Sequence, residues 1–172
     1  SVDLLRTLIG SVPGKDFVCL DFFSGSATAA HAVMQLNAED GGKRKFIMVQ
    51  LPEETPEDSE ARKAGYTTIP EIGKERIRRA GRKIKEEAPL TTQDLDTGFR
   101  VFRLADSNYE EVSKSPKEYD QDQLSLFENN IKADRSDLDL LFGAMLAWGV
   151  TLDLPMESKT IDGCTVYTVN GG

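Results

Sequence analysis

Apolar and polar residues follow one another along the first half of this chain with spacings that change between helix and strand. Helical spacing opens the chain and predicts a short amphipathic helix through Leu4, Leu5, Leu8 and Ile9. Residues 17–22, which begin with the unbroken apolar run 17–20, predict a buried strand, of the kind found at the centre of a parallel sheet. Residues 28–36 predict a helix that ends near Asn37, and residues 45–51 predict a second strand.

The pattern continues through a long helix into a third expected strand. Residues 52–64 are polar and contain two prolines, which indicates a surface loop. Thr68 opens the clearest helix of the chain, with an apolar stripe of Ile69, Ile72, Ile77, Ala80 and Ile84. After a linker-like stretch, residues 99–104 alternate apolar and basic side chains and predict a strand. The resulting order β-α-β-α-β indicates an α/β fold with a parallel sheet and crossover helices.

The character of the sequence changes after Tyr109. Residues 113–122 are polar and expected to be extended, and Leu124, Phe127 and Ile131 suggest a short helix. Ser136 is a good N-cap for a helix whose apolar stripe is Leu138, Leu141, Phe142, Met145 and Trp148. Asp162-Gly163 lies between alternating residues, which predicts a β-hairpin over 160–168. The expected organisation is therefore a domain over 1–110, a linker with a short helix over 111–135, and a small helix-plus-hairpin region over 136–172.

Charge and composition narrow the classes of protein. The apolar content of 39% and charged content of 29% are typical of a globular protein. The formal net charge of −8 argues against a freestanding nucleic-acid binder. The segment 74–85 nevertheless carries seven basic residues and one acid, and is either a solvated helix face or a surface for DNA phosphates.

Other sequence features point to a cytoplasmic protein without a metal centre. No apolar run approaches the roughly 20 residues that cross a membrane, and the first residues lack the order of a signal peptide. Cys19 and Cys164 are expected to be thiols rather than a disulfide. His31 is the only histidine, and no second histidine or cysteine is placed to share a metal with it. Its expected role is packing or a helix surface.

The segment DFFSGSATAAH, residues 21–31, joins the first strand to the next helix through a glycine turn, where α/β proteins bind cofactors. A dinucleotide site requires G-x-G-x-x-G, but only Gly25 is present, with Ala27 and Ala30 at the other glycine positions. The pattern G-x-x-x-x-G-K-[ST] of a phosphate loop is also absent. A cofactor without a phosphate, such as S-adenosylmethionine, and a purely structural tight turn both remain open.

A family resemblance favours the first of these alternatives. The segment 21–53 is similar to the part of β-arrangement adenine-specific DNA methyltransferases that contains motif I, D-x-F-x-G-S-G-T-T-x-x-A. Nearly the whole chain resembles the C-terminal part of the modification (Mod) subunit of type III restriction–modification systems. Supporting segments are VQLPE at 49–53, AGYTTIPEIGKERIRR at 64–79, GFRVFRL at 98–104 and the expected hairpin.

The resemblance implies where S-adenosyl-L-methionine binds. The first cofactor loop would comprise Asp21, Phe23, Ser24, Gly25, Ser26, Ala27 and Thr28. Gln50 stands where the family usually has a ribose acceptor, and Asp106 would lie near the adenine ring. Leu4 to Leu8 resembles the end of motif X. Ala27 replaces a family glycine, so its methyl group is expected either to crowd the methionine end of the cofactor or to force φ away from a glycine-only value.

The fold class implied is a partial Rossmann-like methyltransferase fold followed by a small α+β region. The implied function is the cofactor-binding part of a DNA adenine-N6 methyltransferase, with DNA, a second copy of the chain or a restriction subunit as partners. The catalytic motif D/N-P-P-Y/F/W of the family does not occur in these residues, so no catalytic residue is assigned and this chain alone is expected to be inactive. The alternative is a non-catalytic Rossmann-like module for dimerisation or restriction-subunit contact.

Overall fold

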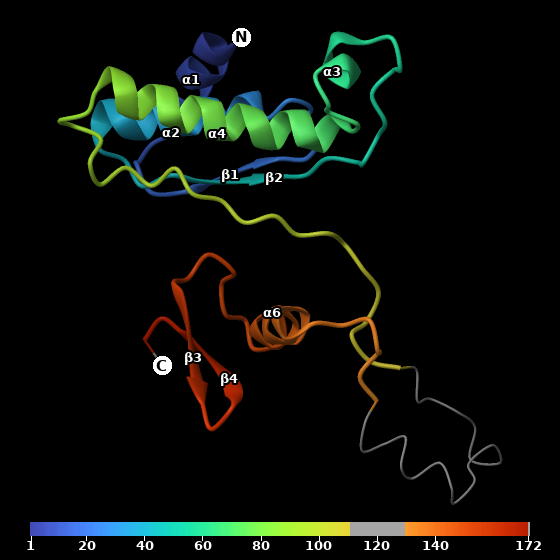
Figure 1. Ribbon diagram of the computed structural model, residues 1–172. Coiled ribbons are helices and arrows are strands. Elements are labelled where there is room, and N and C mark those ends of the chain that lie inside the picture. Colours follow the sequence, from blue (N-terminus) through green and yellow to red (C-terminus); the bar gives the residue numbers. More distant parts are fainter. Residues whose placement is uncertain (111–129, 172) are drawn as a thin grey trace, which may run out of the picture. The chain divides into compact units, whose positions relative to one another are not determined.

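A computed structural model describes residues 1–110 and 130–171, and the chain divides into two compact units, Ser1–Gly98 and Phe99–Gly172. The described residues form a mixed α/β structure with four strands and five helices (Figure 1). Residues 99–110, which the sequence analysis groups with the first domain, lie in the second unit. None of the described helices is both long and apolar enough to cross a membrane.

The first unit is built on a β-α-β element. Strands β1 (Val18–Asp21) and β2 (Lys45–Met48) pair in parallel, with Val18 opposite Lys45 and Asp21 opposite Met48. Helix α2 (Thr28–Asp40) connects them and packs on the strands. It ends at Asp40, three residues beyond the predicted Asn37, and Gly41 caps it in the left-handed conformation. The predicted parallel pairing and crossover helix are confirmed.

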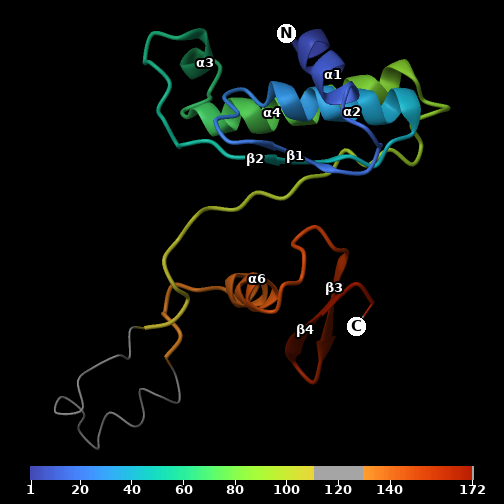
Figure 2. The same ribbon diagram turned by 180° about the vertical axis from the view of Figure 1, so that it is seen from behind.

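Two further helices surround α2. The predicted N-terminal helix is α1 (Val2–Gly10), and it packs against α2, as does α4 (Ile69–Glu87). Figures 1 and 2 show α2 and α4 side by side over the strands. The apolar core lies mainly where these helices meet, at Ala29, Ala30, Ala32, Val33, Met34, Ile77, Ala80 and Ile84.

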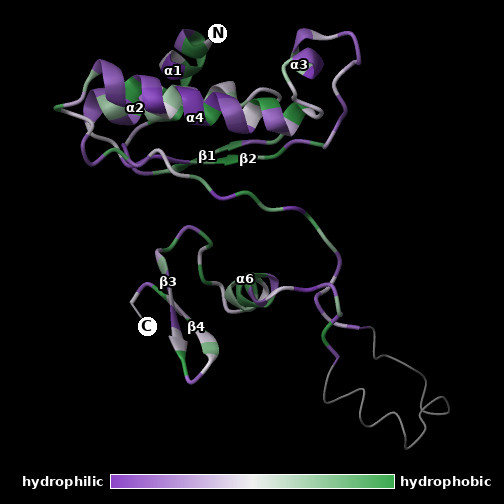
Figure 3. Cartoon of the chain, in the orientation of Figure 1, coloured by the Kyte–Doolittle hydropathy of each residue, from purple (hydrophilic) through white to green (hydrophobic). Residues whose placement is uncertain are grey.

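Local sequence explains where α4 begins. The backbone N–H of Thr68 donates to the Glu71 carboxylate in a capping box, and Pro70 occupies the first helical turn. The buried apolar residues Ile77, Ala80 and Ile84 lie on α4, which packs against α2. Hydrophilic and hydrophobic residues alternate along α4 in Figure 3. The preceding polar loop includes one short helix, α3 (Glu60–Lys63), which the sequence analysis did not predict.

Two expectations about the sheet are corrected. Residues 99–104 form no strand; instead the Arg100 guanidinium donates to the carbonyl oxygens of Leu152 and Leu154, and the Phe102 and Phe142 rings pack edge to face. Arg100 and Phe102 of this alternating segment therefore make side-chain contacts in place of a strand ladder. The first strand is not buried on both faces, because side chains alternate and α2 packs on one face only. Val18 and Leu20 are exposed on the other face.

The second unit contains a helix and a hairpin. Helix α6 (Asp137–Ala147) begins at the predicted cap Ser136, whose hydroxyl accepts from the Asp139 N–H. Strands β3 (Met156–Ile161) and β4 (Cys164–Val169) are antiparallel and turn at Asp162-Gly163, where both φ angles are positive. The cap and hairpin predictions are confirmed. Residues 113–122, which are expected to be extended, and Leu124 and Phe127 of the expected short helix lie outside the described residues.

Candidate cofactor-binding site

The loop 22–27 between β1 and α2 turns sharply through two left-handed residues. Gly25 has a φ of 50°, and Ala27 has a φ of 57° with a ψ of 43°. The Ala27 N–H donates to the Ser24 carbonyl oxygen at 2.7 Å, which closes the turn before Thr28 starts the helix. Glycine adopts this region freely, whereas alanine pays a steric cost there. Ala27 keeps a left-handed φ, so the expectation that its methyl group forces φ away from a glycine-only value is wrong.

The loop is fastened to the end of β2. The Ser24 N–H donates to the Val49 carbonyl oxygen at 3.0 Å, and the Gly25 N–H donates to the Gln50 side-chain oxygen at 2.8 Å. An amide has one oxygen and one NH₂ group, so Gln50 holds Gly25 with its acceptor and presents its donor elsewhere. A carboxylate at this position would have kept a second oxygen for a ribose hydroxyl.

The loop is also fastened to α4. The Arg76 guanidinium donates to the Ser26 hydroxyl oxygen at 2.9 Å. Gly73 of α4 lies against the turn: a Cβ placed there would be 3.3 Å from the Gly25 carbonyl oxygen and 3.5 Å from the Ala27 Cβ. Ala27 is 2% exposed, so its methyl group is buried in contact with α4. The open side of the loop is at Gly25, where an added Cβ would meet nothing within 4 Å.

The remaining expected site residues of the first unit lie at the ends of the same elements. Asp21 is the last residue of β1, and its negative charge adds to burial in raising the pKa of the Cys19 thiol. Phe22 and Phe23 are exposed and pack edge to face. The fold therefore brings together the residues predicted for the loop and Gln50 at the carboxyl ends of two parallel strands, where α/β proteins bind ligands.

Asp106 belongs to the second unit. Its carboxylate accepts from Lys132 and Arg135. The hydrogen bond from Lys132, followed by the charges of both cations, lowers the pKa of Asp106 below its usual value. The role expected for Asp106 near an adenine ring stays a prediction.

Two residues that shape the loop were not found from the sequence. Gly73 and Arg76 lie within a helix whose sequence pattern accounts for them as a small residue and one member of a basic run. Their contacts with the loop depend on how α4 packs beside α2, and no spacing along the chain encodes that. Among the described residues, no group of three or more His, Cys, Asp or Glu side chains is placed to hold a metal ion.

Comparison with known proteins gives relatives along the entire chain, although no family model matches it. The Type III restriction-modification enzyme StyLTI Mod subunit of Salmonella typhimurium is 49% identical over 102 residues, covering 59% of this chain and 15% of that protein. The EcoPI Mod subunit of Escherichia phage P1 is 32% identical over 177 residues, covering 99% of this chain and 25% of that protein. The chain is a homologue of type III Mod subunits.

The resemblance to Mod subunits seen in the sequence is thereby confirmed. The chain spans about a quarter of the EcoPI Mod subunit, which it matches end to end. The Type II methyltransferase M.KpnI of Klebsiella pneumoniae is 35% identical over 72 residues, covering 42% of this chain and 17% of that protein. These relatives support a methyltransferase origin for the mixed α/β structure with its small parallel sheet.

Proposed function

We propose that this chain is the S-adenosylmethionine-binding part of a site-specific DNA adenine-N6 methyltransferase of a type III restriction–modification system. The observation that carries the proposal is the β1–loop–α2 element with its open side at Gly25, in a chain homologous to Mod subunits. The Rossmann-like character of the complete domain is part of the same proposal. DNA and a restriction subunit are the partners that such a protein would have.

The residues present fit a cofactor without phosphate groups. The carboxylate of Asp21 stands at the end of β1 as an acceptor for polar groups of the ligand. Gly25 leaves space for close approach to the backbone, because no atom lies within 4 Å of an added Cβ. The Ala27 methyl group, buried against α4, does not occupy that space. Gln50 fixes the turn through Gly25 and can donate from its NH₂ group.

The cofactor would supply the methyl group, and the residues of this chain would bind and orient it. Holding the target amine and stacking a flipped base require further polar and aromatic groups, and the family motif for them is not in these 172 residues. We therefore expect no methylation of DNA by this chain alone. Transfer of a labelled methyl group to duplex DNA by the purified chain would contradict this part of the proposal.

Calorimetric titration of two glycine variants tests the site. Gly25→Ala adds a methyl group on the open side of the loop, where the cofactor would approach the backbone. Because loss of about 1.4 kcal/mol of binding free energy is a tenfold change, we expect the dissociation constant for S-adenosylmethionine to rise at least about tenfold. Gly41→Ala is the matched control: Gly41 also has positive φ, of 68°, and also has open space at its Cβ, but it ends α2 at the other end from the loop. Both variants carry the same type of backbone strain.

The outcome separates a cofactor loop from a structural turn. Weaker binding by Gly25→Ala alone supports the proposal. Equal binding by both variants, or no binding by the unmodified chain, would leave the turn as a purely structural feature.

A second candidate function is a non-catalytic assembly module. It is favoured by the exposed apolar side chains on the sheet face that α2 does not cover, including Val18, Leu20 and Ile47. If this face joins two copies, light scattering should show a dimer of the chain that Leu20→Ser weakens. A monomer at all concentrations would count against self-association as its role.

A further inference from the structure

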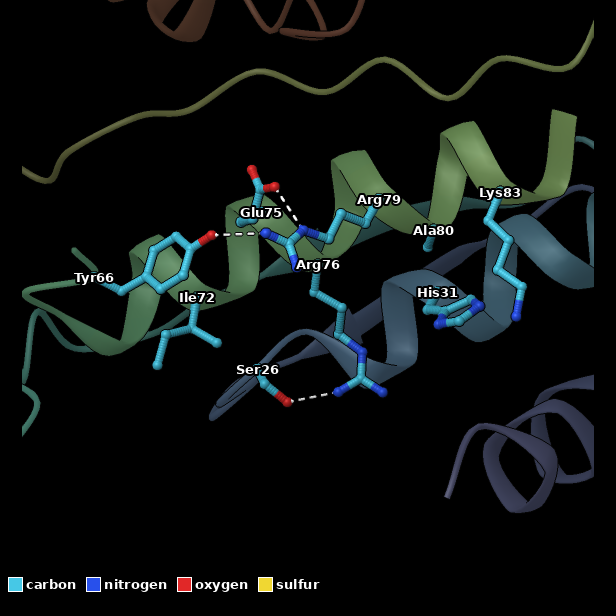
Figure 4. A pocket seen from close by; sticks show the side chains of 9 residues that line it. All are labelled: Ser26, His31, Tyr66, Ile72, Glu75, Arg76, Arg79, Ala80 and Lys83. Atoms are coloured by element: carbon cyan, nitrogen blue, oxygen red, sulfur yellow. Dashed lines mark hydrogen bonds and ion pairs between the residues drawn. The ribbon is translucent and has the colours of Figure 1, made fainter. Parts of the chain in front are cut away.

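A groove with a marked positive character lies between α2 and α4 (Figure 4). Its volume is about 400 Å³, and it opens to solvent. Three cationic side chains, one histidine and one carboxylate are among the residues that line it, which are Ser26, His31, Tyr66, Ile72, Glu75, Arg76, Arg79, Ala80 and Lys83. The cofactor loop contributes only Ser26 to this groove, so the groove is a separate feature of the first unit.

The cations of the groove differ in how strongly they are engaged. Arg79 already has two partners, since its guanidinium donates to the Glu75 carboxylate of α4 at 2.7 Å and to the hydroxyl of Tyr66, which precedes α4, at 3.1 Å. Arg76 donates to the neutral Ser26 hydroxyl, and a guanidinium has five N–H donors in all. Lys83 is 3.6 Å from Glu87 and its side chain is 69% exposed, a pair that solvent screens strongly.

His31 stands on α2 facing these two loosely engaged cations. Burial lowers the pKa of His31, and the positive charges of Arg76 and Lys83 lower it further, while Glu87 opposes them. All three of these charged neighbours come from α4. Arg76 and Lys83 are seven residues apart, two helical turns, so both point to the same side of α4. The arrangement concentrates positive potential at one place on a chain whose net charge is −8.

We propose that this groove binds phosphate groups of a nucleic-acid backbone through Arg76, Lys83 and His31. Phosphate oxygens accept from guanidinium and ammonium groups in charge-assisted hydrogen bonds. An anion placed there would relieve the mutual repulsion of Arg76 and Lys83 and would favour the charged form of His31. The residues of the groove are the argument for an anion site. The choice of nucleic acid over another polyanion rests on the proposed function. Because Arg76 also holds Ser26, a phosphate bound here would contact the support of the cofactor loop.

The single histidine gives a direct readout. We would titrate the His31 imidazole by proton NMR in the 172-residue chain, with and without a short DNA duplex. A phosphate beside the ring favours the imidazolium, so the duplex should raise the pKa of His31. Inorganic phosphate at the same phosphate concentration should raise it much less, because a duplex presents its phosphates as a polyanion.

Two lysine variants test the location by fluorescence anisotropy with the same duplex. Lys83→Ala should weaken binding about tenfold and reduce the slope of log K against log salt by about 1. Lys85→Ala is the matched control, with the same charge change two residues along the helix and about 200° around it. It should change the affinity much less than Lys83→Ala.

Each result decides the proposal. A raised pKa of His31 with duplex and a larger effect of Lys83→Ala support it. A duplex that binds without moving the His31 resonance, equal effects of the two lysine variants, or inorganic phosphate acting as strongly as DNA would overturn it. Cofactor calorimetry is independent of these measurements. If the chain binds S-adenosylmethionine but fails these tests, only the proposal for the groove is refuted. If it passes these tests but does not bind S-adenosylmethionine, only the proposal for the cofactor site is refuted.

Discussion

Replacing Ala27 by glycine tests the unusual backbone of the loop. Ala27 is buried and has a φ of 57°, a combination in which its methyl group and its backbone have opposing effects on stability. Removing a buried methyl group costs about 0.8 kcal/mol, and the greater freedom of glycine in the unfolded chain costs about 0.4–1 kcal/mol. Glycine does not have the steric strain that alanine has in the left-handed conformation, which stabilises the folded variant by about 1–2 kcal/mol. The terms nearly cancel, so we expect a change within about 0.5 kcal/mol.

Ala32→Gly is the matched control. Ala32 is 0% exposed and lies within α2, where the helix has its ordinary handedness. The same methyl loss is then joined by the unfavourable helix propensity of glycine, for a total loss of about 2 kcal/mol. Nothing offsets this loss, because Ala32 has no left-handed strain to relieve.

Urea unfolding followed by far-ultraviolet circular dichroism measures both variants. Comparing midpoints at a common slope gives the difference in free energy of unfolding. A loss of about 2 kcal/mol by Ala27→Gly, equal to that of Ala32→Gly, would refute the account of the strained turn.

Two other substitutions test the supports of the same unit. Gly73→Val places the Cβ of a branched side chain 3.3 Å from the Gly25 carbonyl oxygen. It should destabilise the first unit by about 1–3 kcal/mol in urea unfolding and weaken cofactor binding in calorimetry. Gly10→Ala, whose added Cβ has its nearest contact at 3.5 Å, should change neither quantity. Asp40 accepts a 2.9 Å hydrogen bond from the buried Arg44 guanidinium, which lowers the pKa of the Asp40 carboxyl. The ionised carboxylate therefore stabilises the folded chain above about pH 4, and this stabilisation is lost as the pH falls through the folded-state pKa. Asp40→Asn should therefore lower the free energy of unfolding by about 2 kcal/mol at pH 7 and by progressively less in acid. Asp3→Asn, which removes a charge from an exposed ion pair, should change it little at either pH. A loss for Asp40→Asn that does not depend on pH would contradict the link between this carboxylate and stability.

Local signals predicted the elements whose stability is local. Ser136 with Asp139, Thr68 with Glu71, and Asp162-Gly163 each specify a helix start or a turn through contacts within a few residues. For the same reason the glycine turn at Gly25 could be placed between a strand and a helix from the sequence. The parallel pairing of β1 with β2 followed from the crossover helix between them.

The failures concern contacts between residues far apart in the chain. Alternation in 99–104 resembles a strand, yet Arg100 and Phe102 use it to contact the 142–154 region by side chains. The support that Arg76 gives to Ser26 spans 50 residues, and no periodicity indicates it. The role of Gln50 likewise depends on a distant residue. Its side-chain oxygen accepts from the Gly25 N–H, so that oxygen holds the loop, and the sequence does not indicate this contact.

Calorimetric titration of S-adenosylmethionine into the 172-residue chain tests the central claim most directly. The account predicts a dissociation constant below about 1 mM, with binding lost in Asp21→Ala and kept in Asp16→Ala, which removes the same charge just before β1. No heat of binding at millimolar cofactor, or equal binding by both variants, would contradict the assignment of the β1–α2 loop as the cofactor site.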